Sequence, residues 1–87
     1  MRQRVVVHGS VQGVFFRDSL RRLAERHGVS GWARNTSEGT VEAVFEGEPE
    51  AVERLVSFAQ TGPPDARVEA VDVHEEEPEG LSGFAIK

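Results

Sequence analysis

Hydrophobic and polar residues change their spacing several times along this chain of 87 residues. Residues 5–8 read VVVH, and a β-branched run of this kind is typical of a central strand. A helical period follows, and the apolar positions of its buried face are Phe16, Leu20, Leu23 and Ala24. Gly28 is the expected end of this helix, because glycine readily adopts the left-handed angles found there. The chain therefore begins with a predicted strand, a loop and an amphipathic helix.

Residues 29–47 change to the two-residue period of β-structure. In the segment TVEAVFEG, the side chains of Val41, Ala43 and Phe45 fall on one face. The stretch NTSEG at residues 35–39 has the polar residues and the glycine that turns favour. This part of the chain predicts a β-hairpin whose second strand buries one face.

A second helix is expected to open at Pro49, because proline suits the first helical turn and carboxylates at 48 and 50 suit the positive end of the helix dipole. The sequence GPP at 62–64 is expected to end it. A long strand follows, in which the three-residue step from Val68 to Val71 predicts a β-bulge. A short strand, FAI, is expected at 84–86. The apolar face of the second helix consists of Val52, Leu55, Val56 and Ala59.

The predicted order of elements is βαββαβ with a short fifth strand at the C-terminus. Two helices that each follow a strand can pack on one face of an antiparallel sheet, which is the ferredoxin-like α/β (α+β) sandwich. We expect a single domain over residues 1–87, since this length supports one modest core. The acidic stretch at 75–79 is expected to be a solvated loop.

The charge balance narrows the range of partners. A net charge of -5 argues against nucleic-acid and anionic-membrane binding, since both need clustered cations. The longest apolar run near the N-terminus has three residues, which is too short for a signal peptide or a membrane span. We expect a monomeric, cytoplasmic protein with no nucleic-acid or membrane partner.

The residue inventory excludes several kinds of chemistry. The chain has no cysteine, so disulfides, thiolate catalysis and cysteine-ligated metals are ruled out. Its three histidines lack the spacing of metal ligands, and we expect neither a metal nor another cofactor. Nine of the ten cationic residues are arginine and only one residue is asparagine, a composition that indicates either a heat-tolerant protein or a GC-rich source.

The stretch GSVQGVFFR at residues 9–17 has the features of an anion-binding loop. The first turn of a helix leaves N–H groups without internal acceptors, so a loop that enters a helix presents amides to a ligand. Gly9 and Gly13 permit backbone angles or close approaches that a Cβ would block. Arg17 adds a bidentate donor and a full positive charge. These residues fit a phosphate group, although similar turns also occur with a purely structural role.

Two segments of the chain resemble the signatures of the acylphosphatase family. The first signature, G-x-V-Q-G-V-x-F-R, is matched from Gly9 to Arg17, and the second is matched by GWARNTSEGTVEAVFEG at residues 31–47. The resemblance extends to the βαββαβ order, the Gly-Pro-Pro loop and the Phe-x-Ile ending, so it spans the whole chain. It implies an enzyme that hydrolyses acyl phosphates, which are mixed carboxylic-phosphoric anhydrides, to a carboxylate and inorganic phosphate.

The resemblance also implies roles for individual residues. Arg17 is implied to bind the phosphoryl group, and Asn35 is implied to position the attacking water. The implied partner is a small-molecule acyl phosphate, with inorganic phosphate as the product and an inhibitor. This site requires residues 9–17 and Asn35 to lie close together in the fold. The loop amides implied to bind phosphate are those of Gln12, Gly13, Val14, Phe15, Phe16 and Arg17.

The residue types agree with such a reaction. The leaving carboxylate has a conjugate acid with a pKa of roughly 4, so it departs without a general acid. The amide of Asn35 can orient a water molecule but cannot take its proton. We therefore expect a phosphate oxygen of the substrate to take that proton, in a substrate-assisted reaction that needs no metal.

Four neighbouring residues have weaker claims to a role. His8 is expected to be a strand residue, because a single histidine without a nearby carboxylate is a weak candidate for a base. Thr36 is expected to support the turn around Asn35. Val14 and Phe15 are expected to flank the substrate entrance.

Two other functions stay open at the level of the sequence, and RNA binding is disfavoured. RNA-recognition domains share the βαββαβ order, but the acidic strand TVEAVFEG lacks their basic aromatic pattern, so most aromatic residues are expected in the core. Acylphosphatase-like domains also occur in larger maturation proteins, where carbamoyl phosphate chemistry is relevant; this chain starts at its first predicted strand and ends at its last, which disfavours that reading. A regulatory module that binds a small molecule would not need Asn35.

Overall fold

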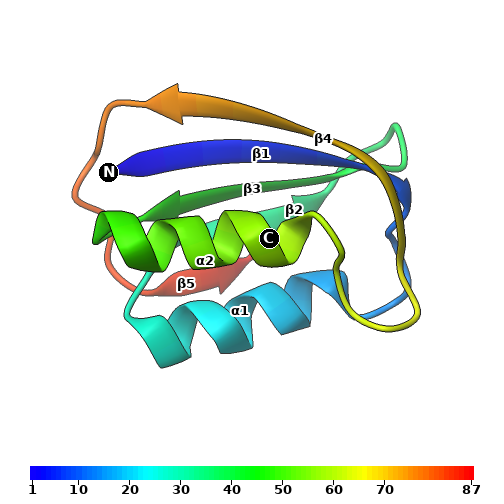
Figure 1. Cartoon of the computed structure of the whole chain (residues 1–87), viewed down its shortest axis with the longest axis horizontal. Helices are drawn as coiled ribbons and strands as arrows, with labels where there is room; N and C mark the ends of the chain where they lie inside the picture. Colours follow the sequence, from blue (N-terminus) through cyan, green and yellow to red (C-terminus); the bar gives the residue numbers. More distant parts are fainter.

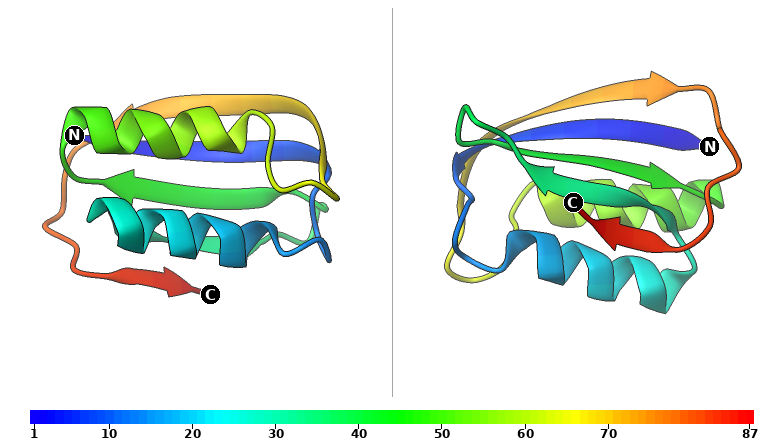
Figure 2. Two further views of the ribbon diagram at one scale, coloured as in Figure 1. Left: turned by 60° about the horizontal axis from the view of Figure 1, so that its bottom comes forward. Right: turned by 180° about the vertical axis from the view of Figure 1, so that it is seen from behind.

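The computed structural model describes all 87 residues and has the predicted order of elements (Figure 1). The strands form one sheet in the order β4-β1-β3-β2-β5, and both helices cover the same face of it (Figure 2). This is the α/β sandwich expected from the sequence. The elements are β1 (Arg2–Ser10), α1 (Phe16–His27), β2 (Ser30–Asn35), β3 (Val41–Glu46), α2 (Pro49–Ala59), β4 (Arg67–Glu76) and β5 (Phe84–Ile86).

The sheet is antiparallel except at one edge. β1 pairs antiparallel with β3 and β4, and β2 pairs antiparallel with β3. β5 instead runs parallel to β2, with Phe84 opposite Gly31. The segment at residues 77–83 crosses the end of the sheet from one edge to the other, so β5 arrives in the direction of β2 (Figure 2). The expected antiparallel sheet therefore becomes mixed at its fifth strand.

The helices bury the faces that their apolar spacing predicts. On α1, the side chains of Phe16, Leu20 and Ala24 are buried, and Gly28 ends the helix in the left-handed region with its N–H bonded to the Ala24 carbonyl. α2 starts at Pro49 as expected. Neither helix has the length and apolar content that crossing a bilayer requires. The buried face of α2 consists of Val52, Leu55 and Ala59.

The predicted β-bulge lies where β4 passes the end of β1. His8 is opposite Ala70 and Gly9 is opposite Val68, so Glu69 is the extra residue on β4. A Cβ on Gly9, which has φ 129°, would overlap the carbonyl oxygen of Arg67. Glycine is therefore required here by the close approach of the neighbouring backbone.

The acidic stretch at 75–79 is only in part the solvated loop that its composition indicates, since residues 77–79 form an exposed loop whereas Glu75 and Glu76 end β4. Glu76 belongs to β4, and its carboxylate accepts hydrogen bonds from Nε of Arg2 at 3.0 Å and from Nε of Arg4 at 2.9 Å. Arg2 is only 6% exposed, although a charged side chain is rarely so buried without partners. We call Arg2, Arg4, Glu46, Glu76 and Glu79 the basal charge cluster.

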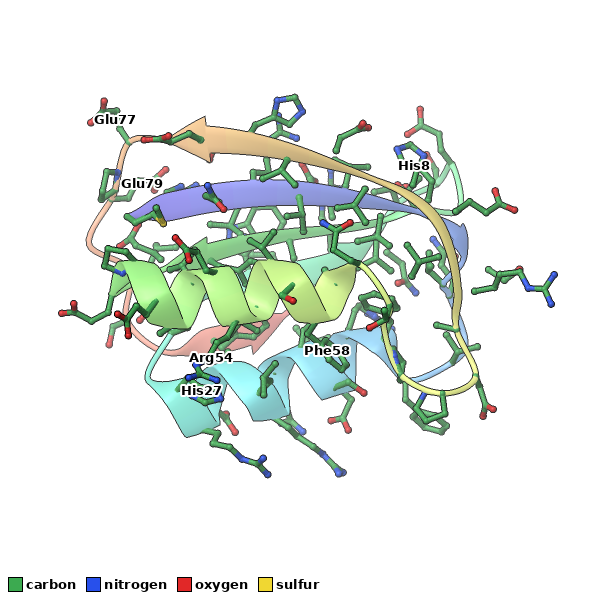
Figure 3. The ribbon with its side chains drawn as sticks, viewed as in Figure 1. His8, His27, Arg54, Phe58, Glu77 and Glu79 are labelled. Carbon is green, nitrogen blue, oxygen red and sulfur yellow. The ribbon has the colours of Figure 1, made fainter.

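The basal charge cluster fastens the crossing segment to the sheet. The Glu46 carboxylate accepts hydrogen bonds from the backbone amides of residues 79–81, at 2.7 to 2.8 Å. Those amides, above all that of Glu79, lower the pKa of Glu46 below its ordinary value despite the opposing effect of burial. The Arg2 guanidinium, followed by that of Arg4, lowers the pKa of Glu76 in the same way. Figure 3 shows Glu79 at the end of the sheet opposite to His8.

Candidate active site

The loop between β1 and α1 presents a row of unpaired amides. Residues 11–15 link the strand to the helix, and none of the backbone N–H groups of residues 12–17 donates a hydrogen bond within the protein. The residue that precedes α1 is Phe15, which has no side-chain acceptor to cap the helix. Amides at such a terminus attract an anion, because they carry the positive end of the helix dipole.

Arg17 extends from the first turn of α1 into the same region. Its Nη1 donates a hydrogen bond to the main-chain oxygen of Lys87 at 3.1 Å, and no carboxylate side chain pairs with it. Asp18, which also lines the pocket, pairs with Arg21 at 2.6 Å and with Arg22 at 2.9 Å. The charge of Asp18 is therefore neutralised by two arginines of the same helix, and no acidic side chain neutralises Arg17.

Asn35 is the last residue of β2 and lies opposite Val41 of β3. The turn that follows is held by the Thr36 hydroxyl, which accepts hydrogen bonds from the amides of Glu38 and Thr40 and contacts the Thr40 hydroxyl at 2.6 Å. Thr36 therefore supports the turn, as the sequence predicts. None of these hydrogen bonds uses the side-chain amide of Asn35.

Gln12 joins the two halves of the site. Its side-chain Nε2 donates to the carbonyl oxygen of Thr36 at 2.8 Å and to that of Thr40 at 3.0 Å. The strands β1 and β2 are not neighbours, because β3 lies between them. The loop and the end of β2 lie at the same end of the sheet. The Gln12 side chain connects them, because it binds the turn between β2 and β3 at both of its ends.

A single pocket of about 270 Å³ brings Arg17 and Asn35 together. This volume is close to the lower limit of ligand pockets, roughly 300 Å³, so the pocket suits a small molecule. The requirement that residues 9–17 lie near Asn35 is met. The residues that line the pocket are Val11, Gly13, Phe15, Phe16, Arg17, Asp18, Asn35 and Ile86.

Two of the secondary expectations need correction. Val14 does not flank the entrance, because its side chain packs against the core. His8 is a strand residue as expected, but it does have a carboxylate partner, since its Nε2 lies 2.9 Å from Asp72. This pair is exposed and outside the pocket lining. Figure 3 shows His8 near the end of β1, at the edge that faces β4.

Three contributions to the site were missed at the level of the sequence. The side chain of Gln12 was overlooked because only its amide was considered, although its place in the first signature was a signal. Asp18 lines the pocket next to Arg17 and was not singled out. Ile86 lines the pocket from β5, and no sequence signal places it there because it depends on the parallel pairing of β5 with β2.

This arrangement can bind a tetrahedral anion and hold a water molecule beside it. Unpaired amides and a guanidinium are the donors that phosphoryl oxygens need. A neutral side-chain amide can donate to and accept from water. The structure has no group of three or more acidic or histidine side chains with the geometry to hold a metal ion. The one acidic side chain of the lining, Asp18, is paired with Arg21 and Arg22.

Known proteins share both the sequence and the fold of this chain. A family model described as Acylphosphatase matches residues 3–86. An acylphosphatase of Rubrobacter xylanophilus is 60% identical over 87 residues, which cover 99% of this chain and 79% of the relative. An acylphosphatase of Thermococcus kodakarensis is 55% identical over 86 residues, with 99% and 94% coverage.

The fold agrees with a solved structure of an acylphosphatase from Coxiella burnetii, with a TM-score of 0.94 at 41% identity. That match covers 99% of this chain and 90% of the other. The ferredoxin-like architecture is thus confirmed by a protein of clear sequence similarity. Because a family model and relatives of comparable length agree over almost every residue, the chain belongs to the acylphosphatase family of hydrolases.

Proposed function

We propose that this pocket hydrolyses an acyl phosphate by direct attack of water on a phosphoryl group held by Arg17 and the amides of residues 12–17. Acyl phosphate hydrolysis is the reaction of the family; the assignment of the steps to these residues is our proposal. The observation that supports it most is the row of unpaired amides that shares a pocket with Arg17 and Asn35.

The proposed reaction forms one bond and breaks one. The water oxygen bonds to phosphorus, while the bond between phosphorus and the acyl oxygen breaks and leaves its electron pair on the carboxylate. Negative charge spreads over the equatorial phosphoryl oxygens, where fixed donors stabilise it. Arg17 and the loop amides are those donors.

The proton of the attacking water is proposed to move to a phosphoryl oxygen of the substrate. Asn35 orients the water but has no basic group to take the proton. The histidine closest in sequence to the loop, His8, is paired with Asp72 outside the pocket, which supports a reaction without a protein base. The only carboxylate of the lining, Asp18, is already paired with two arginines, which supports a reaction without a bound metal.

The test is the hydrolysis of benzoyl phosphate with EDTA present. We expect Arg17→Ala and Asn35→Ala to lower kcat/KM by about a hundredfold or more, which is the usual effect of removing one transition-state donor. Arg17→Lys is also expected to have a low kcat/KM, since lysine cannot form the bidentate contact with the phosphoryl group. Arg26→Ala, at the far end of α1, and Ser37→Ala, in the turn after Asn35, are the matched controls.

Inhibition by inorganic phosphate separates the two roles. We expect inhibition to vanish in Arg17→Ala and to survive in Asn35→Ala, because Arg17 is proposed to hold the phosphoryl group with the loop amides, whereas Asn35 is proposed to orient the water. An inactive wild-type protein would overturn the proposal, and phosphate binding without hydrolysis would favour a regulatory module. A pH-rate profile that requires a base at His8, His27 or His74 would overturn the substrate-assisted step alone.

A further inference from the structure

We propose that Phe15 and Ile86 form an apolar acyl-binding rim that makes the enzyme select acyl phosphates with an aromatic or bulky apolar acyl group. This inference rests on the proposed function, since it assumes that the phosphoryl group lies on the amides of residues 12–17. It adds the substrate class, which the two signatures do not define.

Exposed apolar side chains gather at this pocket. Only four large apolar side chains in the chain are strongly exposed, and two of them, Phe15 at 77% and Ile86 at 41%, line the pocket. They come from opposite ends of the sequence, one from the loop before α1 and the other from β5. The other two exposed residues are Met1 and Val73, and neither is part of the lining.

The backbone of Phe15 gives it a position that core packing does not explain. Its φ of 64° and ψ of 26° place it in the left-handed region, and it is the only residue other than glycine with a positive φ. An aromatic residue is uncommon there, and such strain is found preferentially where a site uses it. The next residue, Phe16, is 2% exposed and belongs to the core. Of these two adjacent phenylalanines, both of which line the pocket, one is therefore exposed and the other is buried in the core.

The pocket lining contains two chemically different groups of residues. Gly13, Arg17, Asn35 and the arginine-paired Asp18 are its polar members. Its apolar members are the exposed Phe15 and Ile86 and the buried Val11 and Phe16. An acyl phosphate has the same division, since its phosphoryl group is anionic and its acyl group can be apolar. With the phosphoryl group on the amides, the acyl group extends to the rim.

The size of the expected selectivity follows from the contact between the acyl group of the substrate and the Phe15 ring. An aromatic acyl group beside the Phe15 ring gains a favourable pair interaction and removes apolar surface from water. An acetyl group is too small to cover the ring. We expect the rim to raise kcat/KM for benzoyl phosphate over acetyl phosphate by about five- to tenfold, the range that corresponds to one such aromatic contact.

The experiment measures the ratio of kcat/KM for benzoyl phosphate to that for acetyl phosphate. We expect this ratio to fall about five- to tenfold in Phe15→Ala and to fall in Ile86→Ala as well. The ratio removes any effect on the phosphoryl site that both substrates share. Val73→Ala, at an exposed valine outside the pocket, is the control whose ratio should equal that of the wild type.

Phe15→Gly separates the ring from the backbone, because glycine accepts the left-handed angles without strain. We expect its ratio to match that of Phe15→Ala. The proposed acyl-binding rim would be overturned if the kcat/KM ratio stayed at the wild-type value in Phe15→Ala. It would also be overturned if the ratio returned to that value in Phe15→Gly, because the loss would then come from the backbone and not from the ring. A wild-type protein that hydrolyses neither substrate would overturn the proposed function instead, so the two failures are distinguishable.

Discussion

Gly9 and Gly13 bracket the same loop but meet different physical needs. Gly9 lies against the backbone of β4, where a Cβ would overlap the carbonyl oxygen of Arg67. Gly13 has open space around its Cβ position, and only its φ of 75° favours glycine. The first glycine lets β4 pass close to β1, and the second lets the chain turn so that the following amides face the pocket.

This difference predicts unequal costs for two alanine substitutions. Gly13→Ala should lower the free energy of unfolding by about 1–2 kcal/mol, the cost of left-handed angles for a residue with a Cβ. Gly9→Ala should lower it more, because the backbone of β4 must also move away. Urea denaturation at neutral pH measures both values. Equal losses in the two variants would contradict the structural distinction.

At the scale of whole elements, the basal charge cluster links the last strand to the rest of the sheet. Glu46 on β3 binds the backbone of residues 79–81, and these lead directly into β5. β5 then places Ile86 in the pocket lining. A carboxylate at one end of the sheet therefore helps to position a wall of the site at the other end.

The lowered pKa of Glu46 predicts a loss of stability in acid. The group stabilises the fold fully above its unfolded-state pKa of about 4.5, and this contribution disappears as the pH falls through the lower folded-state value. At pH 7, Glu46→Gln should lower the urea midpoint, because the amide replaces a charge that three N–H groups bind. The difference from wild type should shrink below pH 4.5 as the wild-type carboxyl becomes protonated.

Glu53→Gln is the matched control for this acid effect, since Glu53 is exposed on α2. Its urea midpoint should follow that of the wild type at every pH. A Glu46→Gln variant that differs from wild type by the same amount at pH 7 and at pH 3 would show that the ionised carboxylate is not the source of the stability.

The elements that could be predicted are those whose signals are local. The apolar spacing of both helices, Pro49 at the start of α2 and the step from Val68 to Val71 each predicted a feature that the structure has. The direction of β5 could not be predicted, because a three-residue strand has no periodic signal and its partner is set by the path of residues 77–83. Glu76 in the acidic stretch was misjudged because its arginine partners lie more than 70 positions earlier.

At the scale of the whole molecule, the dimensions fit one domain. The radius of gyration is 11.5 Å, against about 12 Å expected for a compact domain of this length. One core cluster of 14 buried residues contains side chains from both helices and from three of the five strands or their flanking loops. Negative side chains along β4, which is one edge of the sheet, discourage pairing with a second molecule. We therefore propose a monomeric single domain over residues 1–87.

A single domain of this kind should unfold in one step on heating. We expect the far-ultraviolet circular dichroism and the fluorescence of Trp32 to report the same midpoint, which should not depend on protein concentration if the protein is a monomer. The arginine-rich composition predicts a Tm above about 60 °C, the upper end of the usual mesophile range. Two separate transitions would contradict the single domain, and a lower Tm would contradict the predicted heat tolerance.

Because of the two hydrogen bonds of Gln12, the two halves of the site are already joined in the folded protein before a substrate binds. These bonds hold the loop of residues 11–15, which we propose binds the phosphoryl group, against the turn after Asn35 without the help of a bound molecule. The entropy of bringing these distant segments together is therefore lost once, during folding, and not again at each turnover. A substrate that enters meets donors that are already oriented, so little of its binding energy is needed to reorganise the protein, and more remains to lower the barrier.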